Sequence, residues 1–278
     1  MSGSIGEFAS WLFVPGDRPE RFDKAVSSGA DGVILDLEDA VARGDKAVAR
    51  ANIIDYLRSG RAPNPIGVRV NAPGTTDQRA DLAALDATAM PIAIFIPKVE
   101  RAQDVHAAKS RALFVVAMVE SAAGILRIEE ILDEAPDAIM IGEADLSADL
   151  DCDLAAGVLR TAIDTVLLWA AAYRVPVIAS PSFSVGDLDG VARDALAARR
   201  NGYVAKAAIH PAHIPPIERA FTPTPEEVAT AQEALTTTGT GTVRGQMVDE
   251  AILRHARRII ERGRRSTDGG PAALPSKS

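Results

Sequence analysis

Residues 33–39 read VILDLED, an apolar run that ends in three carboxylates. Similar runs are VRVN at 68–71, MVES at 118–121 and IMIGEADL at 139–146. A strand buried on both faces of a parallel sheet reads as a continuous apolar run. Charged side chains at the ends of such strands have no packing role, and in a (β/α) barrel these ends form the rim where catalytic groups meet. The pattern therefore predicts an active site on the rim of a barrel.

Apolar runs alternate with amphipathic stretches along most of the chain. The predicted strands are Trp11–Val14, Gly32–Leu37, Gly67–Asn71, Ala93–Lys98, Leu113–Glu120, Ala138–Gly142, Pro176–Ser180 and Ala205–His210. The predicted helices are Arg18–Ser28, Lys46–Arg58, Thr76–Thr88, Arg101–Ser110, Gly124–Leu132, Ala155–Tyr173 and Gly186–Asn201. Such alternation indicates parallel strands, and eight of them favour an α/β fold of the (β/α)8 TIM-barrel type. An open doubly wound sheet would need a glycine-rich loop where this chain reads PGDRPER.

The pattern changes after the eighth strand. Three further helices are predicted at His213–Ala220, Glu226–Leu235 and Arg254–Arg264, with the loop TTTGTGT between the last two. We therefore expect a catalytic barrel over residues 1–220, a C-terminal helical extension over 221–264 and a disordered tail over 265–278.

Composition excludes several classes of protein. The 278 residues carry a net charge of -8 with only 4% aromatic residues, which argues against a nucleic-acid-binding surface. Cys152 is the only cysteine, so no intramolecular disulfide can form and a reducing compartment is expected. The chain shows no signal peptide and no apolar stretch of about 18 residues. We expect a cytoplasmic protein without a membrane partner.

Glu120 and Asp145 lie at the ends of the fifth and sixth predicted strands. Neighbouring strands are about 4.8 Å apart, so the two carboxylates could converge on one ion. Two carboxylates with open water positions suit Mg²⁺. The alternative is that each carboxylate caps a helix or pairs with a surface arginine. The further carboxylates Asp36, Glu38 and Asp39 on the same rim weaken that alternative, because a cation would offset their repulsion.

Arg69 interrupts the apolar run of the third predicted strand. A buried guanidinium needs an anionic partner, and its planar fork matches a carboxylate. Arg69 is therefore a candidate to hold a substrate carboxylate, and the alternative is a structural ion pair with Asp36 or Glu38. Lys98 ends the fourth strand, where a Schiff-base lysine is a second interpretation. Asp249, in GQMVDEA, reads locally as a helix cap.

Arg18 and Lys24 follow the first predicted strand, which contains Phe13. Basic residues at the start of a helix could hold phosphate groups, and a solvated helix face explains them equally well.

Eight motifs resemble those of one known family. In order they read FVPGDRPERFDKA, VILDLEDAV, VRVNAPGT, IPKVE, VESAAGI, GEADLSADL, AAIHPAHI and GQMVD. Together they resemble the citrate lyase β-subunit-like group of the HpcH/HpaI aldolase superfamily, from Trp11 to about Arg262. The resemblance implies a TIM barrel, trimeric or a dimer of trimers, that cleaves or forms carbon–carbon bonds with Mg²⁺. Its implied substrates are malyl, citramalyl, methylmalyl and citryl thioesters of CoA or of an acyl-carrier protein.

The resemblance also implies roles for individual residues. Glu120 and Asp145 become metal ligands, Glu38 and Asp39 support metal-bound waters, and Arg69 contacts the keto-acid portion of the substrate. Phe13, Arg18 and Lys24 fall where related malyl-CoA lyases hold the CoA nucleotide. Asp249 falls where the family delivers an acid–base carboxylate to a neighbouring subunit, which replaces the local interpretation as a cap.

One motif departs from the family pattern, since GEADL stands where GAEDL is common. Alternation of side chains along a strand predicts that Glu143 points in a different direction from a glutamate at position 144, while Asp145 keeps its place. The expected reaction is Mg²⁺-dependent cleavage of a 3-carboxy-3-hydroxyacyl-CoA into a keto acid and an acyl-CoA. Two alternatives remain, an aldolase acting on free hydroxy-keto acids and a subunit that needs an acyl-carrier partner.

Overall fold

Eight parallel strands close into a barrel in the computed structural model, which describes residues 5–61, 65–88, 90, 92–109, 114–236, 242–243 and 246–267. The strands are β1 Ser10–Pro15, β2 Gly32–Asp36, β3 Ile66–Arg69, β4 Ala93–Ile96, β5 Phe114–Val119, β6 Ala138–Ile141, β7 Val177–Ala179 and β8 Ala205–Ala208. Each strand pairs in parallel with the next, and β8 pairs with β1. The predicted TIM barrel is confirmed.

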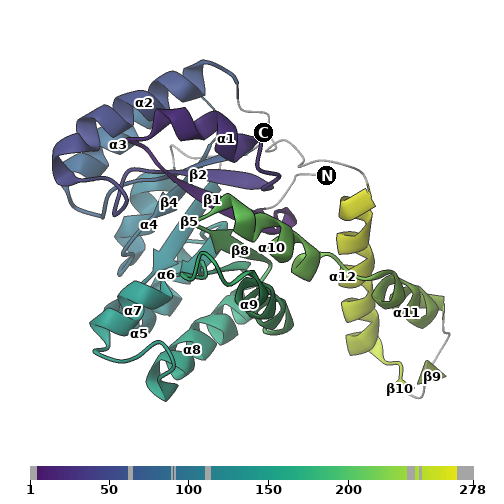
Figure 1. The fold of residues 1–278 in the computed structure, drawn as a ribbon. Helices are drawn as coiled ribbons and strands as arrows, with labels where there is room; N and C mark the ends of the chain where they lie inside the picture. Colours follow the sequence, from purple (N-terminus) through teal and green to yellow (C-terminus); the bar gives the residue numbers. More distant parts are fainter. Residues whose placement is uncertain are drawn as a thin grey trace.

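Helices surround the barrel on its outside (Figure 1). The α-helices are α1 Phe22–Val26, α2 Lys46–Arg58, α3 Thr76–Asp86, α4 Ala102–Lys109, α5 Ala122–Leu126, α6 Ile128–Asp133, α7 Glu143–Asp149, α8 Gly157–Tyr173, α9 Leu188–Arg200 and α10 Ile214–Phe221. Short 3-10 helices are η1 Ile5–Glu7, η2 Pro19–Arg21, η3 Arg43–Asp45 and η4 Pro211–His213. The single helix predicted over 124–132 is two, because the backbone leaves helical geometry at Arg127 (φ -114°, ψ 21°). Helix α7 was not predicted.

Side chains on the strands alternate between the barrel interior and the surrounding helices. In β1, Trp11 and Phe13 belong to the interior cluster, whereas Leu12 and Val14 belong to the core between strands and helices. The Trp11 ring meets the Phe95 ring edge to face at 5.3 Å. A Cβ atom at Gly67 would lie 2.5 Å from the Phe95 ring, so this glycine leaves room for the aromatic pair.

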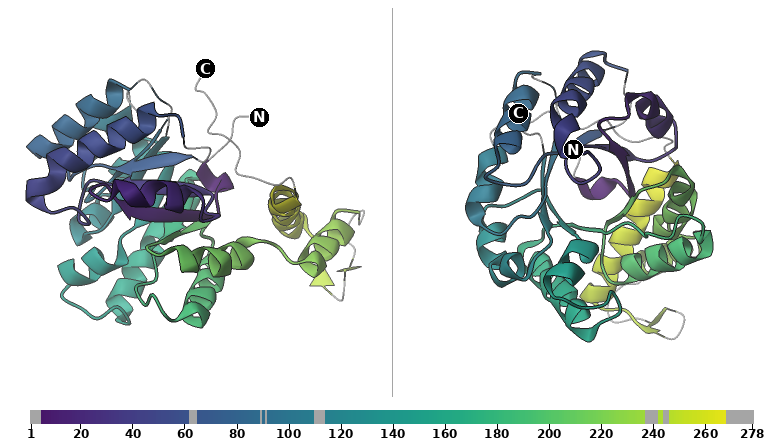
Figure 2. Two further views of the ribbon diagram at one scale, coloured as in Figure 1. Left: turned by 45° about the horizontal axis from the view of Figure 1, so that its top comes forward. Right: turned by 60° about the vertical axis from the view of Figure 1, so that its left-hand side comes forward.

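The C-terminal extension is a helical hairpin that projects from the barrel (Figure 2). It comprises α11 Pro225–Thr236, β9 Thr242–Val243, β10 Gln246–Met247 and α12 Glu250–Thr267. It has a small apolar core of its own, formed by Ala231, Ala234, Val243, Val248 and Ala256. The two short strands were not predicted. Helix α12 continues to Thr267, so the prediction of a disordered tail is wrong for residues 265–267, and the rest of the predicted tail lies outside the described residues. Among the described helices, none is long and apolar enough to cross a membrane.

The Gly67→Ala substitution is expected to lower the free energy of unfolding by about 1–3 kcal/mol, because the added methyl overpacks the barrel interior. Gly157→Ala is the matched control, since a Cβ there meets nothing within 4 Å and the residue begins α8. Urea denaturation of both variants measures the difference. Equal stabilities of the two variants would contradict this account of the interior.

Candidate active site

The carboxyl ends of five neighbouring strands bring the predicted charged residues together. Asp36 ends β2 and lies in register with Arg69 at the end of β3. Lys98 follows β4, Glu120 follows β5, and Asp145 lies in the first turn of α7 directly after β6. Parallel strands place all of these ends on one side of the barrel. The expectation of one charged rim is therefore met by the structure.

Arg69 is held by a fork of two hydrogen bonds to Asp36. Its Nε donates to Asp36 Oδ1 at 2.7 Å and its Nη2 donates to Oδ2 at 2.5 Å. Nη1 lies 3.0 Å from Glu38 Oε2 as a further ion pair. The structural ion pair considered for Arg69 is thus present. N–H groups on Nη1 and Nη2 remain beyond the fork, so the same guanidinium can still donate to a second anion.

Asp36 also fixes the loop that follows β2. Its carboxylate accepts hydrogen bonds from the backbone N–H of Glu38 at 2.8 Å and of Ala40 at 3.2 Å. The side chain is only 1% exposed, so its negative charge depends on these donors and on Arg69. Lys46 supports the loop from the other side by donating to Leu37 O at 2.7 Å. These hydrogen bonds fix the backbone of the loop at Glu38.

Lys98 contacts both Glu38, after β2, and Glu120, after β5. Its backbone is left-handed at φ 52°, its N–H donates to Glu120 Oε2 at 3.2 Å, and its Nζ lies 2.5 Å from Glu38 Oε1 and 3.4 Å from Asp39 Oδ1. Burial alone would lower the pKa of Lys98, but the hydrogen bond to Glu38 and the nearby carboxylates raise it above its ordinary value. A Schiff-base lysine needs a neutral amine, so this alternative does not fit.

Glu120 is the most perturbed carboxyl group of the rim. Burial, followed by the charges of Asp145 and Glu38, raises its pKa to about 8. Its side chain fills the space where a Cβ of residue 142 would lie, at 2.4 Å from Glu120 Cγ, so the chain needs Gly142 at this point. Within the described ranges, no three His, Cys, Asp or Glu side chains are grouped as a metal site. A cation here would have two protein carboxylates at most.

The residues expected to hold CoA occupy different surroundings. Phe13 lies inside the rim, with its ring centroid 5.0 Å from the Arg69 guanidinium carbon. Arg18 is exposed and its Nε lies 3.8 Å from Asp17 Oδ2. Lys24 is exposed on α1. Phe13 therefore contacts the charged rim directly, while the two basic residues remain accessible to solvent.

Asp249 lies on the helical hairpin, where its Oδ1 accepts a hydrogen bond from Ile252 N at 3.0 Å at the start of α12. The local interpretation as a helix cap is thus confirmed. In Figures 1 and 2, β10 and the adjoining start of α12 lie at the outer end of the hairpin, away from the barrel strands. Asp249 is not joined to the rim of its own chain.

Sequence reasoning missed two features of this site. It named Asp36 only as an alternative ion-pair partner of Arg69, and it did not foresee that the same carboxylate holds the backbone of Glu38 and Ala40. It also gave Lys98 no role between Glu38, Asp39 and Glu120, because its left-handed backbone redirects the side chain and leaves no signal in the sequence.

Comparisons with known proteins agree with this geometry. Residues 9–211 match the family described as HpcH/HpaI aldolase/citrate lyase. A citrate lyase subunit beta-like protein of Mycobacterium tuberculosis is 36% identical over 92% of this chain and 96% of its own length. An L-malyl-CoA/beta-methylmalyl-CoA lyase of Rhodobacter capsulatus is 31% identical over 90% of this chain and 92% of its own.

A crystal structure of CitE from Mycobacterium tuberculosis, in complex with magnesium, acetoacetate and coenzyme A, has the same fold. It superposes with a TM-score of 0.82 at 35% identity and covers 93% of this chain and 99% of that one. The family match, the two relatives and the closed barrel with its charged rim lead to one assignment. The chain belongs to the HpcH/HpaI aldolase/citrate lyase family.

Proposed function

We propose that the protein is a Mg²⁺-dependent carbon–carbon lyase that cleaves, or forms, a 3-carboxy-3-hydroxyacyl-CoA thioester. The observation that carries the proposal is the buried Glu120 beside Asp145, within a rim that also holds Arg69. The relatives named as malyl-CoA lyases and the CitE complex with magnesium and coenzyme A support it. Malyl-, citramalyl-, β-methylmalyl- and citryl-CoA are the substrates to be compared.

The residues fit a magnesium ion held by Glu120 and Asp145. Mg²⁺ keeps several of its waters and needs only one or two carboxylates from the protein, which matches the donor set here. Burial, and after it the charges of Asp145 and Glu38, raise the pKa of Glu120, and a divalent cation would stabilise the ionised carboxylate against both effects. Glu38 and Asp39 would hold water around it. When bound, the ion would act as a Lewis acid toward the 3-hydroxyl and carboxylate of the substrate.

Arg69 would hold the keto-acid half of the substrate. Asp36 fixes the plane of its guanidinium, and the Phe13 ring covers one face of it. The remaining N–H groups would donate to the substrate carboxylate and stabilise negative charge as the bond between C2 and C3 breaks. The hydroxyl would release its proton to water held at the rim, the keto acid would form, and the electron pair of the broken bond would remain on the thioester as an enolate.

Asp249 of a neighbouring subunit would supply the proton to the enolate carbon, or remove one from the acyl methyl group in the reverse direction. The position of Asp249 at the outer end of the hairpin supports a role outside its own barrel. In this arrangement residues 1–220 form the catalytic domain, and 221–264 complete the site of the next subunit in a homotrimer or a dimer of trimers. Arg18 and Lys24 would contact the CoA phosphates.

The first prediction of this proposal concerns Asp145. The Asp145→Asn substitution is expected to lower turnover about 1,000-fold, because a weakened metal site loses Lewis-acid stabilisation of the transition state. Release of keto acid from each of the four CoA thioesters, with Mg²⁺ or with EDTA, measures the effect. Asp153→Asn, an exposed carboxylate after α7, is the control.

Full turnover in Asp145→Asn would contradict the metal assignment. A folded, Mg²⁺-binding wild type that cleaves no CoA thioester would direct the proposal to carrier-protein thioesters or to free hydroxy-keto acids, which are assayed next.

The second prediction is a pH dependence that comes from Glu120. Its pKa of about 8 in the folded protein lies above the ordinary 4.5, so between these values the folded state holds a proton that the unfolded chain releases. The free energy of unfolding of the metal-free protein is therefore expected to fall as pH rises through this window. Urea denaturation in EDTA should show this loss in the wild type and less of it in Glu120→Gln.

Magnesium extends this test. Adding Mg²⁺ at about pH 8 is expected to restore stability to the wild type, since a ligand that binds only the folded state stabilises it. Glu120→Gln should gain much less. The same pH dependence in both proteins would show that Glu120 is already ionised in the folded state throughout the window.

The third prediction tests the shared site. Asp145→Asn and Asp249→Asn subunits are each expected to be inactive alone. In every mixed trimer one site of three combines an intact barrel with an intact neighbouring Asp249, so about a third of wild-type turnover should return. Tagging the two chains differently and purifying mixed assemblies allows the measurement. No recovery in mixed trimers would contradict a contribution of Asp249 between subunits.

A further inference from the structure

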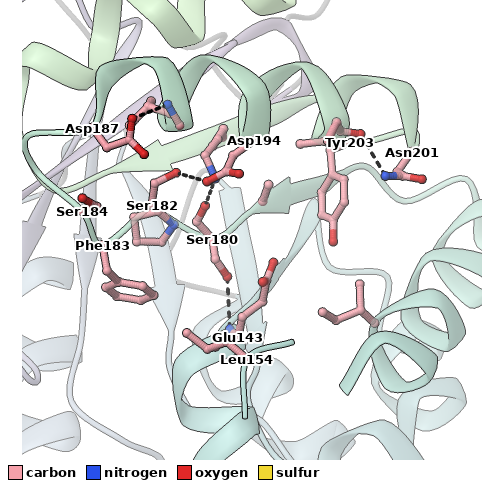
Figure 3. A pocket seen from close by; sticks show the side chains of 18 of the residues that line it. Glu143, Leu154, Ser180, Ser182, Phe183, Ser184, Asp187, Asp194, Asn201 and Tyr203 are labelled. Carbon is pink, nitrogen blue, oxygen red and sulfur yellow. Dashed lines mark hydrogen bonds between the residues drawn. The ribbon is translucent and has the colours of Figure 1, made fainter. Parts of the chain in front are cut away.

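A cavity of about 420 Å³ lies outside the barrel and apart from the charged rim. Helices α8 and α9, the segment after β7 and the first residue of α7 enclose it (Figure 3). Its floor includes Lys206 of β8, whose neighbours Ala205 and Ala207 belong to the barrel interior, so the lysine points outward between strands and helices. None of the residues assigned to the reaction lines this cavity.

Lys206 is a buried ammonium group with little compensation. Its residue is 6% exposed, and its Nζ donates one hydrogen bond, to Ser180 O at 2.6 Å. An ammonium has three donors, and no carboxylate of the described residues forms an ion pair with this one. Burial lowers its pKa, and the charges of Asp194 and Glu143 only partly oppose that effect. A buried charge of this kind is costly unless an anion is brought to it.

Glu143 and Tyr203 face the same space without partners for their polar ends. In Figure 3 the Glu143 carboxylate and the Tyr203 hydroxyl both point into the cavity. Within the described part of the chain, neither group forms a hydrogen bond or an ion pair. Tyr203 is 5% exposed, and burial together with the charge of Glu143 raises its pKa. The cavity thus holds an acidic and a basic group that do not neutralise each other directly.

The other charged groups around the cavity are already engaged. Asp187 accepts from Gly190 N at 2.8 Å, and Asp194 accepts from Ser182 Oγ at 2.8 Å. Arg160 Nε lies 3.1 Å from an oxygen of Asp164 in the next turn of α8. Lys206, with one hydrogen bond, and Glu143, whose carboxylate has none among the described residues, are the charges of the cavity that we assign to a ligand. The rest of the wall is largely apolar and includes Leu154, Ile163, Phe183 and Val191.

We propose that this cavity binds a free α-amino acid with an apolar side chain. Lys206 would bind its carboxylate, Glu143 its ammonium group, and the Tyr203 hydroxyl would add one hydrogen bond. The apolar wall would receive the side chain, as in most small-molecule sites, where a few polar groups fix the orientation. A zwitterion satisfies both unpaired charges at once, which neither a simple anion nor a simple cation can do.

Isothermal titration calorimetry with L-leucine as probe tests this proposal. Two analogues are the controls: 4-methylpentanoate lacks the ammonium group and 3-methylbutylamine lacks the carboxylate. We expect binding of leucine at millimolar concentrations or below, and binding at least about tenfold weaker for each analogue, since each leaves one buried charge unpaired. No heat with leucine, or equal affinity for all three compounds, would overturn the proposal and leave a water-filled cavity.

Three variants locate the binding. Glu143→Gln is expected to weaken leucine binding at least about tenfold and Tyr203→Phe severalfold, because each removes one charged or polar contact. Tyr203→Phe keeps the ring, so it reports on the site even where Glu143→Gln does not fold. Asp145→Asn should bind leucine as the wild type does, which separates this result from the fate of the proposed lyase activity. Unchanged binding in both Glu143→Gln and Tyr203→Phe would also overturn the proposal.

Discussion

The buried ion pair between Arg69 and Asp36 is the interaction on which the rest of the rim depends. Asp36 and Arg69 are direct register partners at the ends of β2 and β3, and both side chains are nearly excluded from solvent. Removing either partner would leave an uncompensated buried charge, which is strongly destabilising. Asp36 also accepts hydrogen bonds from the backbone of Glu38 and Ala40. The same carboxylate therefore sets both the direction of the Arg69 guanidinium and the path of the loop that follows β2.

The rim around this pair carries more negative than positive charge. Asp36, Glu38, Asp39, Glu120 and Asp145 face only Arg69 and Lys98 among the residues that interact there. Arg69 is engaged mainly by Asp36 and Lys98 mainly by Glu38, so in the described part of the chain no cation forms an ion pair with Glu120 or Asp145. Burial first, and then the charges of Asp145 and Glu38, raise the pKa of Glu120 there. A divalent cation is the simplest group that would complete this distribution of charge.

The sequence was sufficient for the barrel and for which residues reach its rim. Apolar runs such as ILDL and FIPK mark buried strands, and parallel strands leave little choice of where their ends lie. The β9–β10 hairpin was missed because two-residue strands give no periodic signal. Side-chain pairing was less predictable: Lys98 reaches Glu38 from a left-handed backbone position that no hydrophobic pattern reveals. The proposed contribution of Asp249 to a neighbouring subunit was expected only through resemblance.

The expectation for the GEADL motif rested on a strand where the structure has the start of a helix. Alternation along a strand was the ground for expecting Glu143 to point away from the direction of residue 144, but β6 ends at Ile141 and Glu143 is the first residue of α7. Successive side chains on a helix differ by about 100°, so moving a glutamate by one position redirects it there too. Here that step places the carboxylate beside the cavity of Lys206, while Asp145 stays near Glu120. The motif thus places one carboxylate, Glu143, at the outer cavity and another, Asp145, at the rim.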